Sequence, residues 1–329
     1  MYSSTLILAL LSATAIASPI TRRDAAPSFL INGDAPFTVD AAILAASLTC
    51  PNGNPSSKSP PVLLVHGTST TGAESWGQGY VPALAANGYT ACYLTLPGRA
   101  MGDMQVSAEY VAYGLHYISS LAGGAQTSVI SHSQGGPLTQ WALQFYPSTK
   151  AVTSTFVALS PDFTGIQVGG GNLSDFCIGN LCQSSIWQQS AGSHFLASLG
   201  SHGFQAQVKT TSIWSQFDGV VSPAQGNANL PSATVVAVQD LCPLRLVSHV
   251  FMTIDAAGFA LALDALQHGS ADLERVQGQI FSVCFRIAAK NMQISVVNQV
   301  QAAWDDAIDG FVLGSPRVTQ EPALMAYAQ

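Results

Sequence analysis

The chain has 329 residues, of which only 9% are charged, and its formal net charge at pH 7 is −7. Nucleic acids and anionic membranes attract clusters of Lys and Arg, so this acidic composition excludes both as expected partners. The length allows one large α/β domain or two small ones, but no Pro/Gly/Ser-rich linker and no repeat divides the chain.

The N-terminus has the pattern of a secretory signal. Leu6 to Leu11 is an unbroken apolar run, and Ala15-Ile16-Ala17 offers a small-residue cleavage site. The run is too short to span a bilayer, and no later stretch is suitable, so we expect no integral membrane association. Arg22-Arg23 resembles a dibasic processing site. The sequence predicts a signal peptide at 1–17, a propeptide at 18–23 and one secreted domain, expected to be monomeric, at 24–329.

Apolar, β-branched runs alternate with helical patterns along the chain. Strands that alternate with helices form a mostly parallel sheet covered on both faces, which defines an α/β architecture. In such sheets the active site forms at the carboxyl ends of the strands. The strand-like runs are 61–65, 89–94, 127–130, 153–159, 209–215 and 233–238, and the clearest helical patterns are 81–87, 107–122 and 137–145.

The run 127–130 breaks into a tight turn of small residues before a helical pattern begins. The turn reads Ser131-His132-Ser133-Gln134-Gly135-Gly136. In a Gly-x-Ser-x-Gly elbow the serine hydroxyl stands above the sheet, and the next backbone N–H points at the bound carbonyl. The pattern predicts Ser133 as a nucleophile, with Ser131 in place of the usual first glycine.

A serine nucleophile needs a base to take its proton and a carboxylate to orient that base. In the α/β-hydrolase fold these follow in the order Ser, Asp or Glu, His. The acid normally follows the second strand after the nucleophile, and the base follows the third. This order predicts Asp218, after the run 209–215, and His249, after the run 233–238.

Other acids and histidines are weaker candidates. Asp162 follows the run 153–159, which is one strand earlier than the strand that the acid normally follows, and Asp240 lies beside the loop that carries His249. His66 precedes the nucleophile in a His-Gly dipeptide, and we interpret it as structural. The remaining histidines are better explained as surface or packing residues: His116, His194, His202 and His268.

Six cysteines in an exported chain indicate three disulfides, whose pairing the residues alone leave open. No CxxC motif and no Cys/His ligand spacing is present. We therefore expect no metal site.

Several unusual motifs together resemble the lipase B family of fungal lipases, within the α/β-hydrolase superfamily. The resemblance extends over nearly all of the chain that follows the predicted propeptide, and it includes the elbow without a leading glycine. The motifs include Leu64-Val65-His66-Gly67-Thr68, Ser133-Gln134-Gly135-Gly136, Ser160-Pro161-Asp162, Trp187-Gln188-Gln189, Cys242-Pro243-Leu244 and Glu321-Pro322-Ala323-Leu324.

The resemblance implies a serine lipase or carboxylesterase that uses no cofactor and acts on an ester or lipid substrate. It implies Ser133 as nucleophile, Asp218 as acid and His249 as base. It implies an oxyanion hole of the Thr68 and Gln134 backbone N–H groups, with the Thr68 hydroxyl as a third donor. Three residues are implied for the substrate pocket: His132, Asp162 and Gln189.

The resemblance also implies two disulfides, Cys50–Cys92 and Cys242–Cys284. The remaining cysteines, Cys177 and Cys182, would form a short local bridge in a small lid at about 165–185. The lid also carries a glycosylation sequon at Asn172.

Three questions stay open. His132 stands where the family's model lipase has a tryptophan, which predicts a wider and wetter pocket on the alcohol side. The late helical pattern, 294–313, either packs on the core or forms a wall of the substrate channel. The alternatives to a lipase or esterase are another acyl-transfer enzyme on this fold, namely a transacylase, polyester hydrolase or amidase, and a non-catalytic binding protein.

Overall fold

The computed structural model describes residues 26–29, 31–314 and 316–329, and for 307–313 the backbone alone. The predicted signal peptide and propeptide lie outside these residues. A seven-stranded sheet has the order β1-β3-β2-β4-β5-β8-β9, in which β1 is antiparallel and the other strands are parallel. Its strands are β1 (Leu48–Thr49), β2 (Pro61–Val65), β3 (Thr90–Leu94), β4 (Thr127–His132), β5 (Thr153–Leu159), β8 (Lys209–Trp214) and β9 (Thr234–Ala237).

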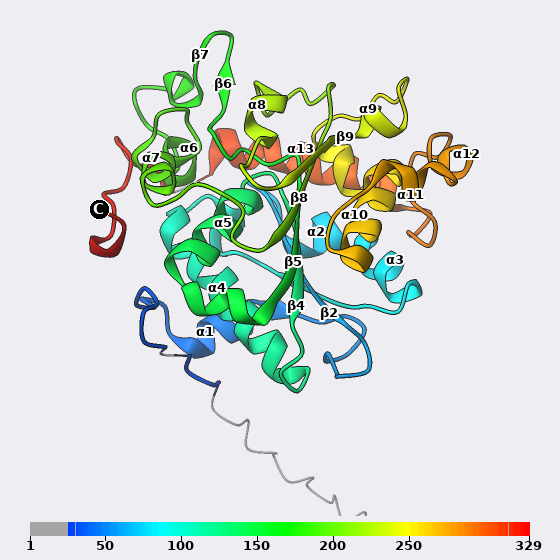
Figure 1. Cartoon of the computed structure of the whole chain (residues 1–329). Coiled ribbons are helices and arrows are strands. Elements are labelled where there is room, and N and C mark those ends of the chain that lie inside the picture. Colours follow the sequence, from blue (N-terminus) through cyan, green and yellow to red (C-terminus); the bar gives the residue numbers. More distant parts are fainter. Residues whose placement is uncertain (1–25, 30, 315) are drawn as a thin grey trace, which may run out of the picture.

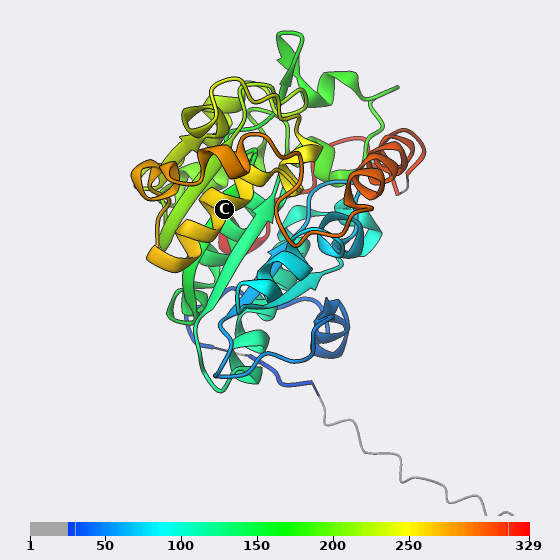
Figure 2. The same cartoon turned by 90° about the vertical axis from the view of Figure 1, so that its right-hand side faces the viewer.

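Helices cover both faces of this sheet, as Figures 1 and 2 show from two directions. One face packs against α1, α4 and α5, and the other against α2, α3 and α10. The helices are α1 (Ala41–Ala46), α2 (Gly72–Trp76), α3 (Tyr80–Ala86), α4 (Met104–Leu121), α5 (Gly135–Phe145), α6 (Ser184–Gln188), α7 (His194–Ser201), α8 (Ala224–Ala228), α9 (Val238–Leu241), α10 (Ala256–His268), α11 (Leu273–Gln277), α12 (Ile280–Val283) and α13 (Val296–Leu313).

The strand β2 is apolar throughout because it contributes side chains to two separate cores. In β2, Leu63 and Val65 belong to the cluster under α4 and α5, whereas Val62 and Leu64 belong to the opposite cluster. Every residue of β2 is buried. A near-continuous apolar run is what a parallel strand covered on both faces requires. The α/β-hydrolase architecture expected from the sequence is thus the one observed.

The helix α4 begins three residues earlier than its apolar pattern predicts. Asp103 caps it, with a carboxylate oxygen that accepts a hydrogen bond from the Gln105 backbone N–H at 2.9 Å. Gln105 is fully buried inside the first turn, where its side chain binds the carbonyl of Ala323 and the backbone N–H of Met325. The apolar pattern does not include this buried polar residue, so the sequence placed the start of the helix too late.

The parallel strands direct their carboxyl ends to one end of the sheet. The hairpin of β6 (Gln167–Val168) and β7 (Gly171–Asn172) lies at this end with α8 and α13, and α1 lies at the opposite end (Figure 1). No helix within the described residues combines the length and apolarity needed to cross a bilayer.

Candidate active site

Ser133 occupies a strained turn between β4 and α5. Its φ of 54° lies in the left-handed region, and its backbone N–H donates to the Leu159 carbonyl at 3.0 Å. A methyl group on Gly135 would lie 2.6 Å from the Val65 carbonyl oxygen, and one on Gly136 would lie 2.7 Å from Pro161 Cβ. The two glycines therefore allow the close approach that holds this turn in place.

Asp218 and His249 meet although 31 residues separate them in the chain. His249 Nδ1 lies 2.8 Å from Asp218 Oδ2, and both side chains are almost fully buried. Asp218 Oδ1 accepts hydrogen bonds from the backbone N–H groups of Val220 and Val221 at 3.0 and 2.8 Å. Burial opposes a charge on Asp218, but His249 and these donors outweigh it and lower the pKa of Asp218 to about 2. The carboxylate is therefore ionised and fixes the orientation of the imidazole.

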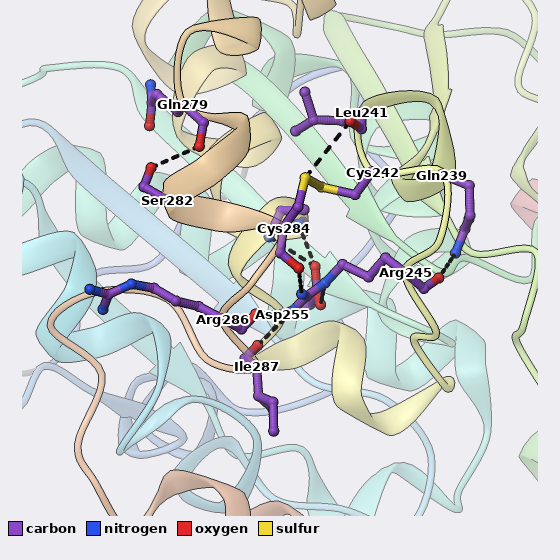
Figure 3. The surroundings of a disulfide bond; sticks show 12 residues. Gln239, Leu241, Cys242, Arg245, Asp255, Gln279, Ser282, Cys284, Arg286 and Ile287 are labelled. Carbon is purple, nitrogen blue, oxygen red and sulfur yellow. Dashed lines mark hydrogen bonds and ion pairs between the residues drawn. A yellow bond between two sulfur atoms is a disulfide. The ribbon is translucent and has the colours of Figure 1, made fainter.

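Arg245 anchors the segment that carries His249. Figure 3 shows its guanidinium between Asp255 and the chain that follows Cys284. Nε lies 2.5 Å from Asp255 Oδ2, and Nη1 donates to the Cys284 carbonyl at 2.9 Å. Nη2 donates to the carbonyls of Arg286 and Ile287. Together with the Cys242–Cys284 disulfide, these bonds tie the segment 242–255 to α10 and to the chain beyond α12.

The segments that carry Asp218 and His249 are also bound to each other. Ser215 Oγ donates to the Val247 carbonyl at 2.7 Å. The Gln239 side chain donates from Nε2 to the Arg245 carbonyl at 2.8 Å and accepts at Oε1 from the Gln216 backbone N–H at 3.0 Å. This buried network fixes the distance between the loops of Asp218 and His249.

The two backbone groups predicted for an oxyanion hole are available. Neither the Thr68 nor the Gln134 backbone N–H has a hydrogen-bond partner within the described part of the chain. The Thr68 hydroxyl is instead engaged, since Oγ1 lies 2.9 Å from Gln134 Oε1 and 2.8 Å from Gln189 Oε1. The hydroxyl carries one proton, so it must leave a glutamine before it can serve as a third donor.

His66 supports the loop that carries Thr68. Its ring is completely buried, with Nδ1 2.8 Å from the Gly67 carbonyl and Nε2 accepting from the Leu96 backbone N–H at 3.0 Å. Burial lowers the pKa of His66 to about 4, so the ring is neutral. These contacts give His66 the structural position that the sequence indicated.

His132, the last residue of β4, contacts the predicted base. Its Nε2 lies 2.9 Å from the His249 carbonyl oxygen, and the two ring centroids are 4.6 Å apart. The side chain is buried and forms part of a cavity wall. A pocket position was predicted from the sequence, but the contact with His249 was not.

Asp162 is completely buried, and neither carboxyl oxygen has a hydrogen-bond partner within the described residues. Burial is the main reason why the pKa of Asp162 rises to about 7, against the opposing attraction of His249. The structure does not bring Asp162 into hydrogen-bonding contact with His249, as it does Asp218. It also places Asp162 outside the set of residues that line the adjoining cavity.

A mainly apolar cavity of about 330 Å³ opens beside Ser133 and His249. No hydrogen bond joins these two side chains within the described residues, a looseness that is common before substrate binds. Gln189 and Thr68 also line the cavity. Sequence reasoning missed most of its apolar wall, although nearness to Asp218, His249 and the lid was an available signal. These wall residues are Ile166, Val168, Leu173, Ile186, Val220 and Val250.

The late helix α13 both packs on the core and lines the cavity, the two roles considered for it from the sequence. Val296 and Val300 pack with Ile254 in a small core cluster, whereas Trp304 lines the cavity. One helix therefore supports the core and closes one side of the site.

All six cysteines form disulfides, in the pairs expected: Cys50–Cys92, Cys177–Cys182 and Cys242–Cys284. The predicted lid contains the β6–β7 hairpin, which ends at the partly exposed Asn172, and the Cys177–Cys182 loop. Within the described residues, no group of three or more His, Cys, Asp or Glu side chains could hold a metal ion.

Comparisons with known proteins agree with this geometry. Residues 59–257 match the family model for class 2 lipases, which is more than half of the chain. Lipase B of Pseudozyma antarctica is 30% identical over 336 aligned positions, which cover 100% of this chain and 95% of that protein. The crystal structure of Aspergillus fumigatus lipase B has a TM-score of 0.82 and 29% identity, and covers 91% of this chain and 74% of its own. The chain therefore belongs to the class 2 lipase family and is an ester-hydrolysing lipase or esterase with an α/β-hydrolase fold.

Proposed function

We propose that the protein is a secreted serine lipase or carboxylesterase that acts through an acyl-enzyme on Ser133. The observation that carries the proposal is the meeting of three features beside one apolar cavity. These are the strained turn at Ser133, the Asp218–His249 contact of 2.8 Å, and the N–H groups of Thr68 and Gln134, which no residue described in the structure binds.

The chemistry follows from these positions. Ser133 Oγ attacks the ester carbonyl while His249 Nε2 takes its proton, and the backbone N–H groups of Thr68 and Gln134 stabilise the oxyanion. When the tetrahedral intermediate collapses, His249 returns the proton to the leaving alcohol. Water then attacks the acyl-enzyme by the same route and releases the carboxylic acid. Asp218 stays ionised and stabilises the protonated imidazole.

The apolar cavity and the lid support acylglycerols and related esters as the substrate class. Secretion is supported by the N-terminal pattern and by cysteines that are all disulfide-bonded, since such bonds persist in oxidising compartments. We further propose a monomer with a site for a glycan at Asn172. Transfer to an added alcohol, measured beside hydrolysis, distinguishes a hydrolase from a transacylase.

Substitution of the nucleophile tests the proposal most directly. We expect Ser133→Ala and His249→Ala each to lower kcat for p-nitrophenyl esters by about 10⁴-fold or more, and the double variant to be little worse, because triad members act as a unit. A fluorophosphonate should label the wild type and not Ser133→Ala. Ser131→Ala, which alters a buried serine two residues away, is the matched control and should still be labelled. Labelling of Ser133→Ala at the wild-type rate would refute the proposal.

A further inference from the structure

The ring of His132 has a fixed proton on one side and a free lone pair on the other. Its Nε2 is 2.9 Å from the His249 carbonyl oxygen, and a carbonyl can only accept a hydrogen bond. Nε2 therefore carries the N–H. Burial, and then the neighbouring His249, lower the pKa of His132 to about 3, so the ring is neutral at working pH. The lone pair must then be on Nδ1.

Nothing in the described part of the chain uses this lone pair. No described residue donates a hydrogen bond to Nδ1, which lies on the side of the ring that faces Gly67. A methyl group on Gly67 would lie 3.4 Å from His132 Nδ1 and 2.8 Å from Ser133 Cβ. All three residues line the cavity. Because residue 67 has no side chain, the acceptor beside the nucleophile is left uncovered.

The position of His249 identifies the part of the substrate that meets this acceptor. The base must stand beside the leaving alcohol, because it returns the proton to that oxygen. The centroid of the His132 ring lies 4.6 Å from that of His249, so His132 lies on the alcohol side of the scissile bond.

We propose that His132 Nδ1 accepts a hydrogen bond from a free hydroxyl on the leaving alcohol. The enzyme then favours esters of diols and polyols, such as partial glycerides, over esters of simple alkanols. This inference rests on the proposed function, since it assigns the alcohol side from the role of His249.

A matched pair of esters tests the preference. The 2-hydroxyethyl and n-propyl esters of butanoic acid differ only in a hydroxyl or methyl group at the end of the alcohol. We expect the kcat/KM ratio of the hydroxyethyl ester to the propyl ester to fall about fivefold when the acceptor is removed, the effect of one typical hydrogen bond. The change between variants is the measured quantity, because it cancels the different hydration of the two esters.

Two substitutions separate the roles of the ring nitrogens. His132→Gln keeps an N–H near the position of Nε2 but has no acceptor near Nδ1, so its ratio should fall. His132→Asn keeps an oxygen near Nδ1 but cannot reach the His249 carbonyl. It should keep the wild-type ratio while kcat falls for both esters.

An unchanged ratio in His132→Gln would overturn the inference, as would loss of the preference in His132→Asn. The proposed function is judged separately, by wild-type turnover of both esters and by labelling of Ser133. An active, labelled enzyme with no dependence of the ratio on residue 132 refutes the hydroxyl acceptor alone.

Discussion

The base-bearing segment, 242–255, contains one cysteine of a disulfide, and the predicted lid, 165–185, contains both cysteines of another. The two segments differ in the contacts around these bonds. In the base-bearing segment the Arg245 side chain is only 9% exposed, and its guanidinium donates hydrogen bonds to one carboxylate and three backbone carbonyls. In the lid, Phe176 and the loop residues Ile178 and Leu181 are exposed to solvent, with Ile178 79% exposed. The first segment is fixed by a buried polar network, whereas the second offers an apolar surface.

The disulfide end of the lid is nevertheless attached to the C-terminal part of the chain. Cys182 and Val318 exchange two backbone hydrogen bonds, at 3.2 and 2.7 Å, and Trp187 Nε1 donates to the same Val318 carbonyl. Beyond this point the loop 177–182 has little buried contact apart from its own disulfide and the small cluster around Ile186. The contrast indicates that a disulfide orders the surrounding chain more strongly when it closes a longer loop and joins a buried polar network.

Among the substitutions that test this contrast, we expect the largest effect at Arg245. Arg245→Met should remove the donors from three carbonyls and leave the buried Asp255 without its cation, which typically costs about 3–5 kcal/mol of unfolding free energy. Because His249 lies four residues away, kcat should fall as well. Urea unfolding and esterase assays measure the two effects.

The matched control is Arg275→Met. Arg275 also binds an aspartate, Asp264, at 2.9 Å, but its side chain is 37% exposed. Because this cation remains largely in contact with water, we expect its loss to cost less unfolding free energy than the loss of Arg245. Equal and small losses in the two variants would show that Arg245 does not anchor the base-bearing segment.

The disulfides themselves give the next largest effect. The Cys242–Cys284 bridge joins residues 42 apart, and the Cys177–Cys182 bridge joins residues 5 apart. Loop-closure entropy then predicts a loss of about 4 kcal/mol for Cys242→Ser/Cys284→Ser and about 2 kcal/mol for Cys177→Ser/Cys182→Ser. Thermal unfolding under oxidising conditions compares the two double variants.

For the interfacial response of the activity we expect the opposite order, with the larger change in the lid variant. Loss of the lid disulfide should change how strongly activity rises when a p-nitrophenyl ester passes its solubility limit, because the exposed apolar loop is altered. If the lid variant were the less stable one, or kept the wild-type interfacial response, the contrast between the two regions would fail.

Asp162 lies where the chain leaves β5 for the lid. We expect substitution of this residue to change the stability least, and to do so in a way that depends on pH. Its pKa in the folded protein, about 7, lies above the ordinary value of 3.8, so the folded state holds a proton that the unfolded chain releases. Its contribution to the unfolding free energy is present below about pH 4 and is lost as pH rises through 7. We expect Asp162→Asn to be more stable than wild type by about 1–3 kcal/mol at pH 8, and nearly equal to it at pH 4.

Melting temperatures at the two pH values measure this difference. Asp305→Asn, on the exposed side of α13, is the control and should change little at either pH. A gain for Asp162→Asn that is equal at pH 4 and pH 8 would contradict the raised pKa.

The sequence predicted the central strands to within a few residues, since their apolar runs depend on burial from both faces. It placed Ser133 on a turn from local pattern alone, because Gly135 and Gly136 follow it directly. It did not predict the lid hairpin β6–β7, whose two-residue strands carry no periodic signal. It also missed the contact between His132 and His249, which joins residues 117 apart.

Residues 244–247 show most clearly what the sequence alone could not decide. Hydropathy predicts Leu244 and Leu246 inside and Arg245 outside, yet Leu244 is 95% exposed and Arg245 is enclosed. The reason is long-range: Asp255 and the carbonyls after Cys284 need donors at this point, and Arg245 is the side chain that can reach them. The sequence by itself determined the alternation of strands and helices, the turn at Ser133 and the order of the candidate groups, because these depend on near neighbours. The tertiary structure decided that His249 meets Asp218 and not Asp162, and which polar side chains are buried, because both depend on distant segments that pack together.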